Sequence, residues 1–289
     1  MNAKFAVIAG SGGYDILGNS DFGTNLECKK IPTPFGESAP IHRFSKDGIN
    51  FLFLSRHGEE RYSIAAPFVN YRANIWALKE CAVERIISWS GPGIINNRFS
   101  VGDFALPHDI IDETKNRQYT FFEKKGIGFI RHKSPFCGET REALIKTFHE
   151  LNLKFHNNGV YVCTQGPRLE TAAEINKYKI SGGDLVGMTL VPETFLAREL
   201  EMCYAPICYL TNFAEGISDR PFKKGELFEG MINNDEQKKA SSSCKRFPVI
   251  IRKSIELIQN LERNCSCKNA LLRYKEDGII SEDWRSWIQ

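Results

Sequence analysis

Short apolar runs alternate with longer amphipathic stretches along most of this 289-residue chain. The runs are rich in β-branched and aromatic residues, and they predict buried strands at 4–10, 41–44, 50–55, 85–89, 159–164, 184–188 and 205–210. The stretches between them predict helices at 69–81, 139–151, 171–180, 192–201 and 234–262, the last interrupted at Pro248. Strands that alternate with helices predict an α/β fold, in which a central mixed β-sheet is flanked by helices.

The chain is expected to form one domain with a short extension. Residues 1–263 show no linker and no internal repeat, and their number suits one large α/β domain. Residues 264–289 form a C-terminal extension that is polar and aromatic by turns, with Trp284 and Trp287. We expect this extension to pack on a neighbouring subunit or to fray.

The charge balance and the apolar runs exclude some classes of partner. The 38 basic and 35 acidic residues leave a net charge of +3, which is too balanced for a nucleic-acid-binding protein. No apolar run approaches the roughly 20 residues of a membrane span. The run Phe5–Ala9 is too short for the core of a secretory signal. We therefore expect a cytoplasmic protein without nucleic-acid or membrane partners.

The nine cysteines are scattered, and single buried thiols are the expected state of most of them. Cys265 and Cys267 are separated by one residue, which is tighter than the two-residue gap usual in a zinc knuckle. Two interpretations stay open for this pair, a redox couple or two solvent-exposed thiols. The sequence shows no cluster with metal-ligand spacing, so no metal site is predicted.

Polar residues follow most of the predicted strands directly. They are Ser11, Arg56, His57, Ser90, Thr164, Thr189 and Asn212. Because ligands of open α/β sheets bind at the carboxyl ends of the strands, we expect these side chains to meet in one site.

Two of these positions suit an anion. The glycine turn Gly10–Gly13 follows the first strand and is either a phosphate cradle or a simple chain reversal. Asp15 stands where a dinucleotide fingerprint requires a glycine, which argues against a Rossmann dehydrogenase. Arg56 beside His57 suits bidentate phosphate capture, the alternative being a surface arginine with a capping histidine.

Glu170 and Asn212 together suit a 6-oxopurine ring. A carboxylate only accepts hydrogen bonds, whereas a side-chain amide both donates and accepts. Guanine and hypoxanthine present an N1–H donor to such a carboxylate, and O6 and N7 to the amide. Adenine would place an unpaired N1 acceptor against the carboxylate, so the pair predicts selection of 6-oxopurines over adenine.

The order of several motifs resembles the trimeric purine nucleoside phosphorylase family, in the branch shared with 5′-methylthioadenosine phosphorylase. The motifs are Gly10–Gly12, Arg56–Gly58, Val69–Lys79, Val101–Asp103, Gly166–Thr171, Gly187–Glu193 and Thr211–Asn212. The resemblance implies phosphate binding by Ser11, Arg56, His57, Ser90 and Thr189. It implies nucleoside binding by Trp89, Leu169, Glu170, Met188, Asn212, Phe213 and Ala214, with Asn212, His57 and Arg56 as the catalytic residues.

The same resemblance implies the reaction and the assembly. Members cleave a purine nucleoside with inorganic phosphate as co-substrate, giving the free base and a sugar 1-phosphate, without a metal or an organic cofactor. Active sites completed by a neighbouring chain imply a homotrimer or a dimer of trimers.

The departures from the methylthioadenosine branch concern the base pocket and the sugar. That branch has aspartates at the positions of Asn212 and Ala214 and a small hydroxyl residue at Glu170, so the chain is closer to the inosine and guanosine type. A second histidine of the branch has no counterpart near Arg61 and Tyr62.

Two alternatives remain. Phe228 and its neighbour Leu227 are apolar, which keeps open a phosphorylase for 5′-methylthioinosine or 5′-methylthioadenosine. The other alternative is a non-catalytic nucleoside-binding sensor on the same fold.

Overall fold

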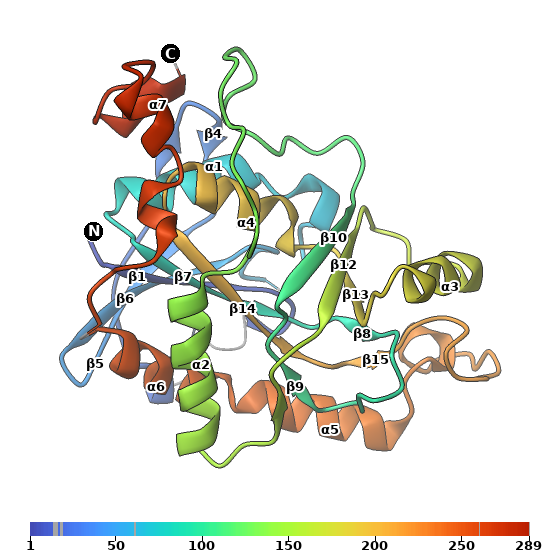
Figure 1. Ribbon diagram of the computed structural model, residues 1–289. Helices are drawn as coiled ribbons and strands as arrows, with labels where there is room; N and C mark the ends of the chain where they lie inside the picture. The colour runs from blue at the N-terminus through green and yellow to red at the C-terminus, as the bar shows by residue number, and fades with distance from the viewer. Residues whose placement is uncertain (14–16, 18–19, 61, 260, 289) are drawn as a thin grey trace.

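The computed structural model describes residues 1–13, 17, 20–60, 62–259 and 261–288 (Figure 1). Its centre is an eight-stranded sheet in the order β11-β9-β14-β7-β1-β6-β5-β2. The four middle strands run parallel: β14 (Cys203–Tyr209), β7 (Arg85–Ser90), β1 (Phe5–Ala9) and β6 (Ile49–Ser55). Every residue of β1, β7 and β14 is buried, as expected for parallel strands covered on both faces.

Antiparallel strands complete this sheet on both sides. Strands β5 (Ile41–Lys46) and β2 (Thr24–Lys29) continue it beyond β6. Strand β9 (Phe104–Ala105) pairs antiparallel with β14 and parallel with β11 (Phe155–His156). The predicted α/β fold with a central mixed sheet is therefore confirmed. Strand β2 was not predicted, because its residues are polar and mostly exposed and form no apolar run.

A second, five-stranded sheet continues from the ends of the central strands. Its order is β10 (Asp109–Glu113), β12 (Val160–Thr164), β13 (Leu185–Gly187), β8 (Gly93–Ile94) and β15 (Asn212–Phe213). Two residues separate β7 from β8, and two separate β14 from β15. The chain thus passes from one sheet into the other at the carboxyl ends of the parallel strands. A small hairpin, β3 (Pro32–Thr33) and β4 (Gly36–Glu37), stands apart.

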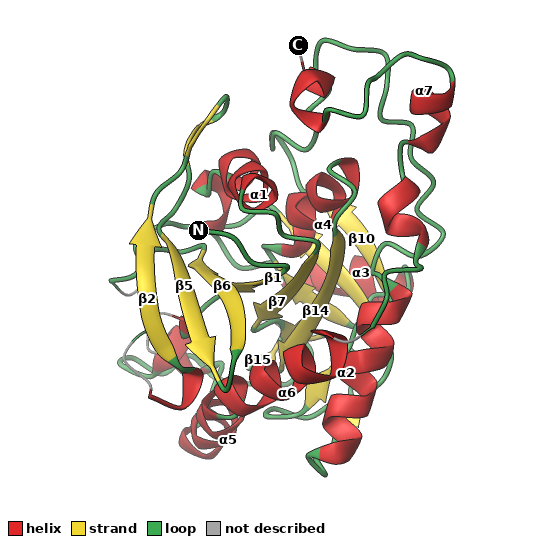
Figure 2. Ribbon diagram, turned by 90° about the vertical axis from the view of Figure 1, so that its left-hand side faces the viewer, coloured by secondary structure: helices red, strands yellow, loops and turns green. Residues whose placement is uncertain are grey.

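The longer helices cover the two faces of the central sheet (Figure 2). Helices α1 (Tyr71–Glu80) and α4 (Leu190–Glu199) pack on the face that receives Ala6 and Ile8 of β1. Helices α2 (Gly138–Glu150) and α6 (Phe247–Gln259) pack on the opposite face, which receives Val7. This alternation along β1 is the period of a strand buried on both sides.

Other helices lie at the rim. They are α3 (Ala172–Ile180), α5 (Asn234–Lys245), α7 (Leu272–Glu276) and the 3₁₀ turns η2 (Ser20–Phe22), η3 (Ala66–Phe68), η4 (Leu227–Gly230), η5 (Ser266–Asn269) and η6 (Trp284–Ile288). The predicted helix at 234–262 is two helices, α5 and α6. The interruption falls at Arg246, and Pro248 lies in the first turn of α6. Backbone N–H groups of a first turn have no acceptor within the helix, so the N–H that proline lacks costs no hydrogen bond there.

The C-terminal extension packs on its own chain, beside α1 (Figure 1). The Trp284 ring lies 4.6 Å from the Trp76 ring, and Arg285 forms an ion pair with Glu80 at 2.6 Å. Trp287 is 1% exposed. The expectation that this segment frays is therefore wrong for its two tryptophans, and its packing on a neighbouring subunit stays a prediction. Within the described ranges, no helix combines the length and the apolar character needed to cross a membrane.

Candidate active site

A cavity of about 680 Å³ lies where the two sheets meet. It collects most of the residues that the sequence placed in the site: Ser11, His57, Ser90, Leu169, Glu170, Met188, Thr189, Asn212 and Ala214. Phe213 faces an adjoining hollow of about 330 Å³, which shares Leu169 and Ala214 with the larger cavity. Arg56 and Trp89 do not line either space.

Arg56 is fully buried and forms an ion pair with Glu193 of α4. Its Nε and Nη2 donate to the two carboxylate oxygens at 2.5 and 2.8 Å, so the fork that could grip phosphate holds a carboxylate. Burial disfavours the cation, but the charge of Glu193 outweighs this effect and raises the pKa of Arg56. A Cβ at Gly10 would lie 2.8 Å from Arg56 Nη1, so the glycine lets the first loop approach this permanent positive charge.

Trp89 belongs to the core rather than to the cavity wall. Its ring stacks on Tyr209 at 5.3 Å and contacts Phe247 at 4.3 Å. Its carbonyl oxygen accepts hydrogen bonds from Gly10 N at 2.9 Å and from Arg56. The Trp89 side chain therefore does not reach the cavity in which a nucleoside would bind. Packing against Tyr209 and Phe247 explains why a large indole stands at this position.

His57 lines the cavity and is held in one tautomer. Its Nδ1 lies 2.8 Å from the carbonyl oxygen of Ile64, which can only accept, so Nδ1 carries the proton and Nε2 keeps its lone pair. The ring also stacks on Tyr62 at 4.1 Å. Burial of the ring, reinforced by the charge of Arg56, lowers the pKa of His57 to about 3. His57 is therefore neutral at pH 7 and offers an acceptor to a protonated phosphate oxygen.

Hydroxyl groups from three strand ends add donors beside His57. Ser90 Oγ lies 3.3 Å from the hydroxyl of Tyr161, which burial keeps protonated by raising its pKa well above 10. Thr189 precedes α4 and makes no capping bond with its side chain. Ser11 receives a hydrogen bond on its carbonyl oxygen from Tyr209 at 2.9 Å, which fixes the first loop against β14.

Glu170 lines the same cavity. The hydroxyl of Thr164, at the end of β12, donates to Glu170 Oε1 at 2.5 Å. This bond orients the carboxylate and leaves its second oxygen as an acceptor. Glu170 therefore presents only acceptor positions, as the base-reading hypothesis requires.

Asn212 opens β15 and is 9% exposed. Its Nδ2 donates to the carbonyl oxygen of Phe213 at 3.0 Å, and its Oδ1 accepts from the hydroxyl of Thr211 at 2.7 Å. Since a carbonyl oxygen can only accept, the first contact fixes which end of the amide is nitrogen. One amide hydrogen then remains for a ring atom such as N7.

Arg117 fastens the backbone beneath the base-reading residues. Its Nη1 donates to the carbonyl oxygens of Met188 and Val191 at 2.6 and 2.5 Å. Its Nη2 donates to those of Thr164 and Gln165 at 3.1 and 2.7 Å. One guanidinium thus joins the end of β12 to the start of α4.

The third wall of the cavity comes from the segment between β15 and the end of α5. It is lined by Phe228, Met231, Ile232, Gln237, Ala240, Ser241 and Cys244. This wall is mainly apolar and contains no histidine among the described residues. Arg220 and Glu236 brace it with two contacts of 2.5 Å. Arg61, considered above for the second histidine, and the Leu227 side chain lie outside the described residues.

Sequence reasoning missed three residues that shape this site: Glu193, Arg117 and Tyr161. Glu193 stands in the quoted motif Gly187–Glu193, and an acidic residue in a buried helix was a signal that a cation must face it. Arg117 lies in a long irregular segment, and its sequence neighbours carry no signal. Tyr161 lies within a predicted strand, where its hydroxyl could not be separated from core packing.

Comparisons with known proteins agree with this arrangement. Residues 4–253 match the family model described as the phosphorylase superfamily, and the chain belongs to this family. A "6-oxopurine nucleoside phosphorylase" of Pyrococcus furiosus is 42% identical over 275 residues, which cover 93% of this chain and 97% of the relative. An "S-methyl-5′-thioadenosine phosphorylase" of Saccharolobus solfataricus is 38% identical over 271 residues, covering 93% and 96% of the two chains.

The fold is shared with a solved structure as well. A methylthioadenosine phosphorylase from an antarctic soil metagenomic library superimposes with a TM-score of 0.84 at 28% identity, covering 100% of this chain and 99% of the other. These relatives confirm the resemblance to nucleoside phosphorylases that the motifs indicated. The names of these relatives include both of the substrate types that the sequence left open.

Proposed function

We propose that this protein is a purine nucleoside phosphorylase that cleaves inosine- and guanosine-type nucleosides with phosphate to give the free 6-oxopurine and ribose 1-phosphate. The observation that carries this proposal is the pairing of Glu170 and Asn212 in one cavity with His57, Ser90 and Thr189. The first pair matches the N1–H and N7 of a 6-oxopurine, and the other three residues match an oxyanion. The name of the Pyrococcus furiosus relative points in the same direction.

The phosphate end supplies both a nucleophile and a counter-charge. Cleavage of the N-glycosidic bond develops positive charge on the ribose, which a phosphate dianion below the anomeric carbon stabilises. Ser90 and Thr189 donate hydroxyl hydrogens to its oxygens, and neutral His57 accepts from an oxygen that carries a proton. Arg56, buried behind Gly10, adds positive potential without leaving its pair with Glu193.

The base end stabilises the departing purine. Negative charge flows into the ring as the bond breaks, so the amide hydrogen of Asn212 bonds more strongly to N7 in the transition state than in the ground state. Glu170, oriented by Thr164, accepts from N1–H and holds the ring in register. Inorganic phosphate is the only co-substrate in this scheme, which uses no metal and no organic cofactor.

The direct test is release of hypoxanthine from inosine, followed by absorbance with and without phosphate. Guanosine, adenosine and 5′-methylthioadenosine run in parallel. We expect phosphate-dependent cleavage of inosine and guanosine and little cleavage of the 6-amino compounds. Ready cleavage of adenine nucleosides with no action on inosine would overturn the proposal. Binding without cleavage in any condition would identify a nucleoside sensor instead.

A second candidate concerns the 5′ end of the sugar. Phe228, Met231 and Ile232 give the third wall an apolar character, which suits a 5′-methylthio group better than a free hydroxyl. The Saccharolobus solfataricus relative is named for such a substrate. Gln237 and Ser241 in the same wall offer hydrogen bonds to a hydroxyl. Comparing kcat/KM for 5′-methylthioinosine and inosine separates these two candidates, because both carry the same base.

We also propose an assembly and a location for this protein. Phe228 and Leu169 line both hollows and are nevertheless exposed, and we propose that a neighbouring subunit covers them in a homotrimer or a dimer of trimers. Sedimentation velocity distinguishes these states. For a role in purine salvage we propose a cytoplasmic location.

A further inference from the structure

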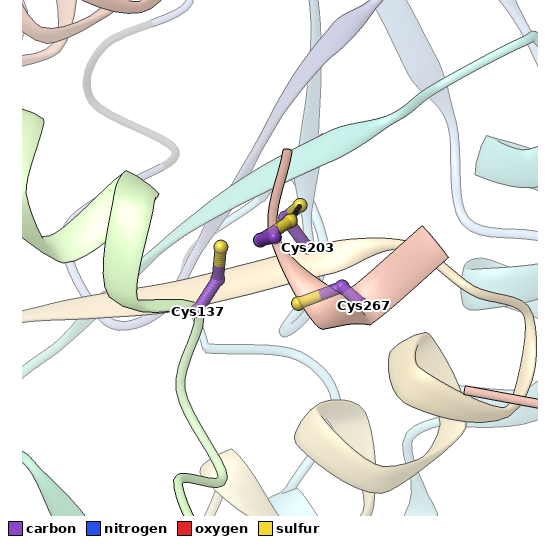
Figure 3. Close-up of side chains that lie close together, drawn as sticks. Cys137, Cys203 and Cys267 are labelled. Atoms are coloured by element: carbon purple, nitrogen blue, oxygen red, sulfur yellow. Dashed lines mark hydrogen bonds between the residues drawn. The ribbon is translucent and has the colours of Figure 1, made fainter. Parts of the chain in front are cut away.

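Four cysteines that lie far apart in the sequence meet at the end of the molecule away from the cavity. They are Cys137, Cys203, Cys265 and Cys267, and their sulfur atoms all lie within 4.8 Å of one another. Cys137 precedes α2 and Cys203 begins β14. Cys265 precedes the turn η5 of the C-terminal extension, and Cys267 lies within it. Figure 3 shows the side chains of Cys137, Cys203 and Cys267 converging from these three elements.

The burial of this cluster corrects the interpretation of the Cys265 and Cys267 pair as solvent-exposed thiols. Cys203, Cys137 and Cys267 are 0%, 1% and 2% exposed, and Cys265 is partly buried. The spacing of one residue between Cys265 and Cys267 gave no metal signal, because the other two ligands come from the body of the domain.

We propose that these four cysteines bind one Zn²⁺ ion as a structural tetrathiolate site. In a tetrahedral site with zinc–sulfur bonds of about 2.3 Å, neighbouring sulfurs are about 3.8 Å apart. All four sulfur atoms lie within 4.8 Å of one another, and Cys203 Sγ lies 3.3 Å from Cys265 Sγ. Small shifts of these side chains bring the sulfur–sulfur distances to the tetrahedral value. Four ligands fill the coordination sphere, which is the pattern of a structural rather than a catalytic zinc site.

The surroundings of the cluster support bound thiolates. Four thiolates around Zn²⁺ carry a net charge of −2, and Arg263 Nε donates to Cys203 Sγ at 3.3 Å. Arg263 also donates to the carbonyl oxygen of Glu201, which fixes its position. Glu139 is an anionic neighbour of the cluster. Its carboxylate accepts a hydrogen bond from the backbone N–H of Asn264 at 2.9 Å and forms an ion pair with Arg85 at 3.6 Å.

Two disulfides are the competing chemistry for the same residues. Disulfides require sulfurs to be close only in pairs, whereas here each sulfur is near the other three. Zinc would replace the thiol protons, release them to solvent, and tie the C-terminal extension to α2 and β14. Because Cys203 and Asn212 lie at opposite ends of β14 and its continuation, loss of the ion should affect stability more than substrate binding.

The test begins with the wild-type protein, purified under reducing conditions from cells grown with zinc. Elemental analysis is expected to find about one zinc ion per chain, retained on dialysis against a chelator and released by a mercurial reagent. Replacement of zinc by Co²⁺ should give the absorption of tetrahedral thiolate-bound cobalt, a readout that needs no variant. X-ray absorption should show four sulfur ligands.

Variants identify the ligands. Cys267→Ser and Cys137→Ser are expected to lose the ion and to melt at a lower temperature, with the KM for nucleoside unchanged. Cys81→Ser, which removes a buried thiol at the end of α1, is the matched control and should keep the ion. Peptide mapping without reductant that finds disulfides among the four cysteines would overturn the proposal. So would a wild-type protein with substoichiometric metal, four alkylatable thiols and no cobalt spectrum.

Discussion

The two ends of the active-site cavity are held in place in different ways. At the phosphate end, Arg56 is bonded to Glu193, which lies 137 residues away in the sequence, and both are buried. At the base end, Glu170 is bonded to Thr164 and Asn212 to its immediate neighbours, all within six residues. The Arg56–Glu193 pair is therefore a tertiary contact, whereas the side-chain bonds of Glu170 and Asn212 are local.

This difference has a consequence for substitutions. Changing a group whose partner lies in another element breaks a buried long-range contact and affects folding as well as chemistry. Changing a group whose partner is a sequence neighbour leaves the packing between elements intact. We therefore expect the phosphate end to couple activity to stability and the base end to control activity and selectivity with little change in stability.

The largest effect is expected for Glu193→Gln. This change keeps the shape of the side chain but leaves the buried Arg56 cation without its counter-charge, which typically costs about 3–5 kcal/mol. It also weakens the acceptor of the Tyr204 hydroxyl, now bonded at 2.7 Å. Urea unfolding measures the loss of stability, and inosine phosphorolysis should fall with it.

The matched control for this variant is Glu174→Gln. Glu174 pairs with Arg168 at 2.7 Å on the surface, and a glutamine still completes the capping box of α3. An exposed pair contributes about 0–1 kcal/mol. Equal destabilisation by the two substitutions would contradict the special weight given to the buried pair.

The next effect is expected for Asn212→Ala at the base end. Loss of one donor to developing negative charge typically raises the barrier by about 2.7–4 kcal/mol, which lowers kcat roughly 100- to 1,000-fold. The unfolding midpoint should change little, because the bonds of Asn212 are to Thr211 and Phe213. Steady-state kinetics with inosine check the first expectation. Near-normal turnover would remove Asn212 from the mechanism.

A change of selectivity is expected for Glu170→Gln. A glutamine amide offers a donor to the N1 of adenine, so discrimination between inosine and adenosine should fall by the equivalent of about 1–3 kcal/mol. The ratio of kcat/KM for the two nucleosides measures it. If that ratio is unchanged while both rates fall together, Glu170 positions the substrate without reading the base.

Sequence reasoning located the positions that follow the central strands better than the long-range contacts of their side chains, for the same physical reason. The central strands and the positions after them follow from apolar runs and from the turn residues that end them, and the side chains of Glu170 and Asn212 bond to residues within six positions. Arg56 was expected to grip phosphate, but its fork is taken by Glu193, a contact that no local pattern reveals. Trp89 was likewise placed in the site, although the packing of Phe247 from α6 draws its ring into the core.

The four-cysteine cluster shows the same limit. Its members come from α2, β14 and the C-terminal extension, so spacing could not reveal it. Long-range pairing is set by how elements pack, and a single sequence records this packing only weakly.

A further effect is expected in the pH dependence of stability, through His57. Its pKa is about 3 in the folded protein and about 6.5 when unfolded, so the unfolded chain binds the extra proton between these values. The contribution of His57 is complete above pH 6.5 and is lost as the pH falls toward 3, by at most about 1.4 kcal/mol per pH unit. In His57→Asn, whose amide still donates to Ile64, the difference in unfolding free energy from wild type should shrink or reverse on acidification. His149→Asn, at an exposed ring, controls for the change of residue type. Parallel pH profiles for wild type and His57→Asn would show that the phosphate end does not hold this ring neutral against protonation.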